Sequence, residues 1–233
     1  SKGLVQISLS DSFGNPVNGY ELLLTSDDAG VSFEQPTDPT DEAGVTYGYV
    51  SSTNAGIIRI SAILKTNPDF RVPPLQVTVN AGAPAKIKLP AGETNQFVGN
   101  IGAALKSPLT VVVTDANDNP VGARKADVKF DIKNGGGYFE ESGLKQATLE
   151  TDSSGRASVH LLLGVTANQP YEIEAKIIYP QGLNAALTFI GQARNPEVAL
   201  PWSLTKVSGD SITAPVAEPL PEPFVVKVTD SQG

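Results

Sequence analysis

Acidic and amide side chains alternate along residues 115–120, which read Asp-Ala-Asn-Asp-Asn-Pro. Carboxylate and amide oxygens at alternate positions are ligands that Ca²⁺ accepts in protein loops. The same residue types favour a tight polar turn, because Asp and Asn side chains bond to nearby backbone N–H groups and Pro fixes its own φ. No second acidic cluster is evident elsewhere in the chain to complete a calcium site. We therefore expect a turn at residues 115–119 and keep a calcium site as the alternative.

Other residues with chemical potential lack the partners that catalysis needs. His160 is the only histidine, and since it alternates with Val159 and Leu161 we expect it to point outward from a strand. The glycine-rich residues 134–137 precede neither a Lys-Ser/Thr pair nor a helix, so they do not fit a phosphate loop. With no cysteine, histidine pair, paired-carboxylate signature or nucleotide fingerprint, the sequence predicts no enzyme and no cofactor.

Tyr47 and Tyr49 are candidates for a protein contact. The pattern around them places Val45, Tyr47 and Tyr49 on the outer face of a strand, with Thr46, Gly48 and Val50 facing inward. Exposed aromatic side chains in a row are typical of contact surfaces. A slip of one residue would invert the faces and bury both tyrosines in the core, and this alternative stays open.

The elements that would position these residues recur along the chain. The polar turn at Asp115 follows a β-rich alternating run, 109–114, and a similar run and turn surround Asp11. A third copy begins at Phe224, reaches Asp230 and stops. The three aspartates are 104 and 115 residues apart, a period that suits one β-sandwich domain.

Period-two alternation and turn signals predict the fold class. The clearest alternating runs are 5–9, 57–64, 127–132, 157–163 and 171–177, and no stretch has helical period over a useful length. Turns that begin with Asp and end with Gly, at 41–44 and 152–155, lie at matching places in the two units. We predict an all-β protein built of tandem immunoglobulin-like antiparallel β-sandwiches.

Composition bounds the partners. The net charge of −8 and pI of about 4.7 argue against binding nucleic acid or an anionic membrane. No apolar run reaches 18 residues, so we expect no membrane insertion by this segment. The chain lacks methionine even at its start, so we expect it to be a piece of a longer protein.

Two joints divide the predicted chain. Small and proline-bearing residues mark a joint at 81–85, and a second joint is expected from Gly191 to about Leu200. The predicted domains are a first sandwich at 1–83, a second at 84–195, and a linker with the first strands of an incomplete third repeat at 196–233. Trp202 is expected to plug a domain junction rather than to bind a sugar.

The second unit resembles a known family. Its motifs are Val-Thr-Asp-Ala-Asn-Asp-Asn-Pro-Val at 113–121, Asn-Gly-Gly at 134–136, Thr-Asp-Ser-Ser-Gly at 151–155 and Tyr-Glu-Ile-Glu-Ala at 171–175. They are similar to those of bacterial group-one immunoglobulin-like domains, which recur in the invasin and intimin adhesins. The first unit matches more loosely. The resemblance implies a rod of such domains on a bacterial surface, often carried by an outer-membrane anchor and ending in a receptor-binding tip.

We therefore expect a non-catalytic spacer or stalk segment of an extracellular, cell-surface adhesin. Its expected partners are neighbouring immunoglobulin-like repeats or copies of itself, with any host receptor bound through another part of the parent protein. The alternative is a filament subunit. The first unit lacks the lead-in of about 20 residues that precedes Leu109, whereas residues 196–233 resemble such a lead-in with no domain attached. That orphan strand could add to a neighbouring copy, although a longer array cut at this point explains it more simply.

Overall fold

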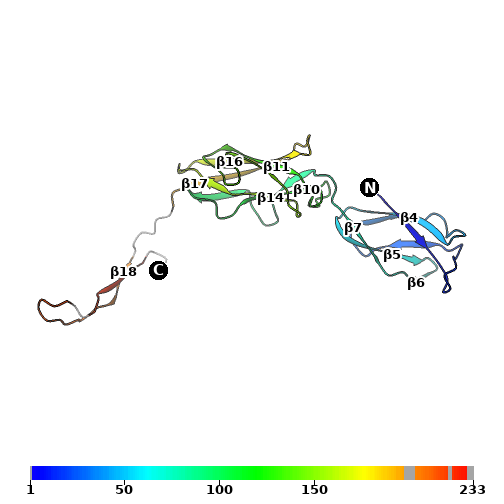
Figure 1. Ribbon diagram of the computed structural model, residues 1–233, viewed down its shortest axis with the longest axis horizontal. Helices are drawn as coiled ribbons and strands as arrows, with labels where there is room; N and C mark the ends of the chain where they lie inside the picture. The colour runs from blue at the N-terminus through cyan, green and yellow to red at the C-terminus, as the bar shows by residue number, and fades with distance from the viewer. Residues whose placement is uncertain (1, 197–202, 220–221, 230–233) are drawn as a thin grey trace. The chain divides into compact units, whose positions relative to one another are not determined.

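The computed structural model describes residues 2–196, 203–219 and 222–229 (Figure 1). Every regular element in those ranges is a β-strand, which confirms the predicted all-β class. By its internal contacts the chain divides into two units, Ser1–Arg194 and Asn195–Gly233. Within the described part of the chain, no helix could cross a membrane.

The first sandwich comprises strands β1 to β7. One sheet has the order β1-β4-β3, and in the other β5 pairs with β2, β6 and β7. Their bounds are β1 Gly3–Ser8, β2 Leu22–Thr25, β3 Val31–Glu34, β4 Val45–Ser52, β5 Gly56–Leu64, β6 Asn67–Arg71 and β7 Leu75–Val79. Alternate residues of β5 are buried, because a strand with one face on a core alternates between buried and exposed positions. Two small buried clusters, around Leu24 and around Ile60, form the core.

The second sandwich comprises strands β8 to β17. One sheet has the order β14-β10-β8 and the other β13-β11-β16-β17-β9, with β12 and β15 forming a separate pair. The bounds are β8 Lys86–Lys88, β9 Gln96–Asn100, β10 Leu109–Thr114, β11 Asp127–Asn134, β12 Gly137–Phe139, β13 Gln146–Glu150, β14 Arg156–Val159, β15 Leu161–Leu163, β16 Pro170–Tyr179 and β17 Ala186–Arg194. One continuous core joins the sheets, and in it the rings of Phe130 and Phe139 meet edge to face at 6.2 Å.

The two sandwiches repeat the same turn contacts. The backbone N–H of Gly44 donates to the Asp41 carbonyl at 2.8 Å, and that of Gly155 donates to the Asp152 carbonyl at 3.0 Å. Both glycines have a φ of 72°, in the left-handed region. A Cβ on Gly155 would lie 2.8 Å from the carbonyl oxygen of Val113, so this turn packs directly on the strand before the Asp115 turn.

The anchor strand β10 departs from the predicted alternation, because all six of its residues are buried. It lies between β8 and β14, and on its second face Thr110 Oγ1 lies 2.9 Å from Ser158 Oγ. The corresponding strand β1 is at a sheet edge and alternates. A central strand flanked on both sides thus loses the half-exposed pattern that the sequence suggested.

Three other expectations need correction. Residues 191–194 are not a joint but the end of β17, with Ala193 fully buried. Strands β6 and β9 were not predicted, and β9 pairs with β17 in parallel, so the sheets are not purely antiparallel. The run 157–163 is not one strand: it changes partner at His160, from β10 to β12.

The sequence suggested that the last strand is unpaired, but the structure pairs it. β18 (Ser203–Ser208) and β19 (Val225–Thr229) form an antiparallel hairpin. Val228 pairs with Leu204, as Val113 of β10 pairs with Ile87 of β8. The hairpin of β18 and β19 therefore repeats the pairing of β8 with β10. Trp202 lies outside the described residues.

Candidate functional site: a turn between two sandwiches

The Asp115 turn closes on its own aspartate. The backbone N–H of Asp115 donates to the Asn119 carbonyl at 2.9 Å. Its carboxylate Oδ1 accepts the backbone N–H of Asn117 at 2.8 Å and that of Asn119 at 3.0 Å. Asp118 has a φ of 69°, which Asp tolerates in turns. The predicted polar turn is therefore present, and its shape is set by local hydrogen bonds.

The second carboxylate oxygen of Asp115 ties the joint to the turn. Oδ2 accepts the backbone N–H of Gly82 at 2.8 Å and the side-chain N–H of Asn119 at 3.0 Å. Burial of the carboxyl raises its pKa, but hydrogen bonds from Asn119, Gly82 and Asn117 outweigh burial, so the pKa of Asp115 is lowered. Gly82 belongs to the predicted joint at 81–85, which is thus bonded to the second sandwich.

The geometry favours the turn over the calcium alternative. Backbone and amide N–H groups surround the Asp115 carboxylate, and these donors stabilise an anion but repel a cation. Across residues 2–196, 203–219 and 222–229, no three His, Cys, Asp or Glu side chains are grouped as metal ligands would be. Asp118 instead faces Lys86 at 3.0 Å and Lys88 at 3.4 Å.

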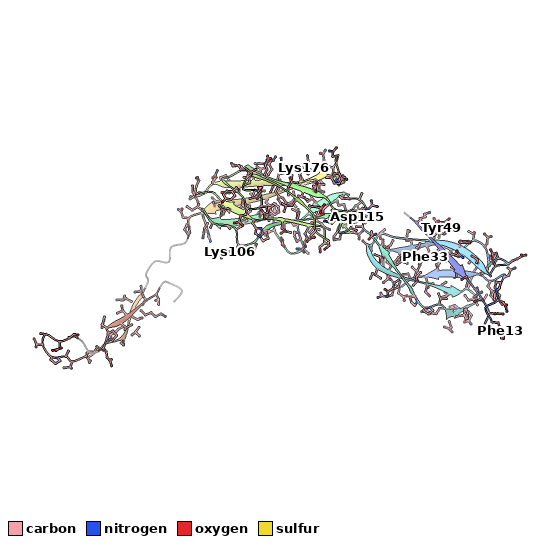
Figure 2. All side chains as sticks on the ribbon, viewed as in Figure 1. Phe13, Phe33, Tyr49, Lys106, Asp115 and Lys176 are labelled. Carbon is pink, nitrogen blue, oxygen red and sulfur yellow. The ribbon has the colours of Figure 1, made fainter. Side chains whose placement is uncertain are left out.

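Asn119 also contacts the first sandwich. Its Oδ1 accepts the backbone N–H of Ala55 at 2.9 Å, and its Nδ2 donates to the carbonyl of Thr53 at 2.8 Å. Thr53 and Ala55 lie in the loop between β4 and β5, and Ala55 packs against the core of the second sandwich. Residues from this loop, from the end of β7 and from the Asp115 turn line a shared cleft that Arg124 also reaches. One side chain thus bonds to its own turn and to the neighbouring sandwich (Figure 2 labels Asp115).

Tyr47 and Tyr49 lie on the exposed face of β4, in the predicted register (Figure 2 labels Tyr49). They are 51% and 44% exposed, whereas Thr46 and Val50 are buried. Tyr49 is paired across the sheet with Leu4, itself 61% exposed, and Tyr47 with Gln6. Their role in binding a protein stays a prediction.

His160 and the glycine-rich residues have structural roles. His160 is exposed, and its Nδ1 lies 2.7 Å from Oε1 of Glu141. Burial raises the pKa of Glu141, and the hydrogen bonds from His160 outweigh it, so the pKa is lowered. The backbone of Gly135 packs on the ring of Tyr171, which leaves no room for a side chain there. The Tyr171 hydroxyl in turn accepts the N–H of Gly164 at 2.8 Å.

The bridging role of Asn119 was missed by sequence reasoning. A signal was present, because Asn precedes Pro in both turns, at Asn15-Pro16 and at Asn119-Pro120. The pattern indicated a turn but not which distant backbone groups the amide would meet.

Solved structures similar to this chain include bacterial adhesin domains. InvD of Yersinia pseudotuberculosis is 14% identical over 82% of this chain and 64% of its own, with a TM-score of 0.48. The Escherichia coli adhesin FdeC is 19% identical over 82% of this chain and 60% of its own, with a TM-score of 0.44. The Yersinia pseudotuberculosis adhesin InvE is 15% identical over 91% of this chain and 61% of its own, with a TM-score of 0.37.

The chain spans about three fifths of the length of these solved structures. No protein-family model and no curated protein matches the chain.

Proposed function

We propose that this chain is a non-catalytic spacer segment of a bacterial cell-surface adhesin-type protein, and that it holds a distal binding domain away from the cell. The observation that carries the proposal is the pair of hydrogen bonds by which Asn119 accepts the N–H of Ala55 and donates to the carbonyl of Thr53. A spacer transmits length only if its joints resist bending. A side chain that bonds to both sides of a joint serves that purpose.

The joint itself has few free residues. Ala81 is buried, the N–H of Gly82 donates to Asp115, and the N–H of Ala85 donates to the carbonyl of Thr114 at 2.8 Å. Each fixed backbone residue removes conformational freedom that a flexible linker would keep. These contacts support a joint of restricted motion.

The remaining parts of the proposal rest on the sequence motifs. Domain bounds of 1–83, 84–195 and 196–233, an extracellular location, and neighbouring repeats as partners all belong to it. Any host receptor would be bound by another part of the parent protein. The exposed Tyr47 and Tyr49 would then be free for a lateral protein contact.

Distances between spin labels on the two sandwiches test the spacer. One label replaces the exposed Lys65 of the first sandwich, and the other replaces the exposed Ile178 of the second. The proposal predicts one narrow distance distribution that Asn119→Ala broadens. A broad distribution in the unsubstituted protein would contradict it.

The second candidate function is that of a filament subunit, and two observations on strand pairing support it. β10 has β8 along its edge, whereas the equivalent edge of β1 has no strand among the described residues. The hairpin of β18 and β19 repeats the β8–β10 pairing. β18 therefore corresponds to β8, and in a filament it would pair with the open edge of β1 in a neighbouring copy.

Light scattering over a concentration series decides between the candidates. The filament predicts a mass that grows with concentration for residues 1–233 and stays monomeric for a chain ending at Asn195. Monomers in both cases would exclude strand donation between copies.

A further inference from the structure

The turn at Asp11 reproduces the turn at Asp115. Oδ1 of Asp11 accepts the backbone N–H groups of Phe13 and Asn15, each at 2.9 Å, and Oδ2 accepts the Asn15 side-chain N–H at 3.0 Å. The backbone N–H of Asp11 donates to the Asn15 carbonyl at 2.9 Å, as Asp115 does to Asn119. The hydrogen bonds from Asn15, followed by those from backbone groups, lower the pKa of Asp11. The Asn15 amide is therefore held in the orientation of the Asn119 amide.

What differs is the outer side of the turn. Oδ1 of Asn119 receives Ala55, but within the described residues no donor reaches Oδ1 of Asn15. Asp115 is 3% exposed, while Asp11 and Asn15 are both exposed.

An exposed aromatic side chain lies two residues before Asn15 in the same turn. Phe13 is 88% exposed at the end of the first sandwich (Figure 2), and its counterpart Asn117 lines the cleft at the joint. An apolar side chain of this size gains free energy when a partner covers it. The free amide oxygen of Asn15 and the exposed ring of Phe13 thus belong to the same turn, at the positions that Asn119 and Asn117 occupy in the Asp115 turn.

We propose that the Asp11 turn is a docking site for the β4–β5 type of loop of another sandwich of this kind. The Asn15 amide would accept one backbone N–H and donate to the carbonyl two residues earlier, as Asn119 does with Ala55 and Thr53. Phe13 would cover the apolar side of that loop. The proposal extends the spacer proposal, because the observed joint is its template.

A cation is a poor occupant of this turn. Three N–H groups already point at the Asp11 carboxylate and occupy three of its roughly four lone-pair sites, and these donors stabilise an anion but repel a cation. A β4–β5 type of loop offers partners for both groups of the Asn15 amide, an N–H and a carbonyl two residues apart. The internal joint shows that such a loop fits.

The test is an extended chain, in which a second copy of residues 1–108 precedes Val5 of the full protein. The lead-in strands of the added copy then join β1 as they join β10 here. The added copy carries Ile57→Val, a substitution of a side chain that is 59% exposed, so that its peptides differ in mass. Hydrogen exchange is measured at the Ala55 amide of both copies.

We expect the Ala55 amide of the added copy to exchange about tenfold more slowly than in the same chain with Asn15→Ala in the original copy, where Asn15 faces the added copy. Phe13→Ser, which leaves every hydrogen bond of the turn in place, is expected to speed this exchange by a smaller factor. Exchange at the Ala55 amide of the original copy should become faster with Asn119→Ala and should stay unchanged with Asn15→Ala or Phe13→Ser. Unchanged exchange in the added copy with Asn15→Ala would overturn the docking site, whereas an original Ala55 amide insensitive to Asn119→Ala would overturn the spacer joint.

Discussion

The carboxamide oxygen of Asn119 accepts the backbone N–H of Ala55, 64 residues earlier in the chain, at 2.9 Å. The same carboxamide donates to Oδ2 of Asp115 at 3.0 Å. A single side chain is thereby fixed by its own turn before it meets the neighbouring sandwich. Such preorganisation lowers the entropy lost in forming the contact.

Asn119→Ala should loosen the joint. The substitution removes two hydrogen bonds to the first sandwich and leaves the Ala55 N–H without this acceptor, at a cost of about 1–3 kcal/mol. Chemical unfolding followed by fluorescence of the two sandwiches measures the loss. Asn15→Ala is the matched control, since Asn15 has the same internal bonds but no contact across the joint. Equal losses for both variants would show that the turn matters only locally.

Gly155→Ala should destabilise the second sandwich by about 2–4 kcal/mol. A φ of 72° strains any other residue, and the added Cβ would lie 2.8 Å from the Val113 carbonyl oxygen. The control is Gly143→Ala, because Gly143 has a φ of 66° with nothing within 4 Å of a Cβ. Thermal unfolding of the two variants separates backbone strain from the clash. An equal cost for Gly143→Ala would show that the close approach of Gly155 to Val113 adds nothing to the backbone strain.

Acid should weaken the joint through Asp115. The folded pKa of this carboxyl lies below its ordinary value of 3.8, so its stabilisation is complete above about pH 4 and is lost as the pH falls through the folded value. Asp115→Asn should cost about 1–3 kcal/mol at pH 7, because an amide N–H would then face the N–H donors. Unfolding free energies measured from pH 7 to pH 2 should show the two proteins converging at low pH. A constant difference would contradict the role of this charge.

Tyr171→Phe should cost about 1–3 kcal/mol, because the N–H of Gly164 loses its buried acceptor at 2.8 Å. Tyr171 is 1% exposed, so water cannot replace the hydroxyl without rearrangement. Tyr47→Phe removes a hydroxyl from a side chain that is 51% exposed and should change stability by less than about 0.5 kcal/mol. Urea unfolding of both variants makes the comparison.

The sequence predicted the faces of the strands well, because alternation fixes them. The alternating runs 127–132 and 171–177 each place one face on the core, where Phe130, Tyr171 and Ile173 are buried, and Tyr47 is exposed on the outer face predicted for it. Strand β9 could not be predicted in the same way. Its residues 96–100 include Gln, Gly and Asn, and they form a strand through parallel pairing with β17. Such pairing depends on the tertiary fold rather than on local propensity.

The candidate site was predicted only in its local part. Asp and Asn at positions 115–119 favour a turn whatever surrounds them, so the turn is readable from the residues. The contact between Asn119 and the loop at Thr53 depends on how two sandwiches meet. No local pattern in the sequence encodes that meeting.

The most direct test of the spacer is the rotational motion of the two sandwiches in solution. Backbone ¹⁵N relaxation of the full chain gives a correlation time for the amides of β4 and β5 and another for those of β11 and β16. A restricted joint predicts that the two sandwiches share one rotational diffusion tensor, and that Asn119→Ala separates them. Two different correlation times in the unsubstituted protein would mean that the sandwiches tumble independently, and this would contradict the spacer.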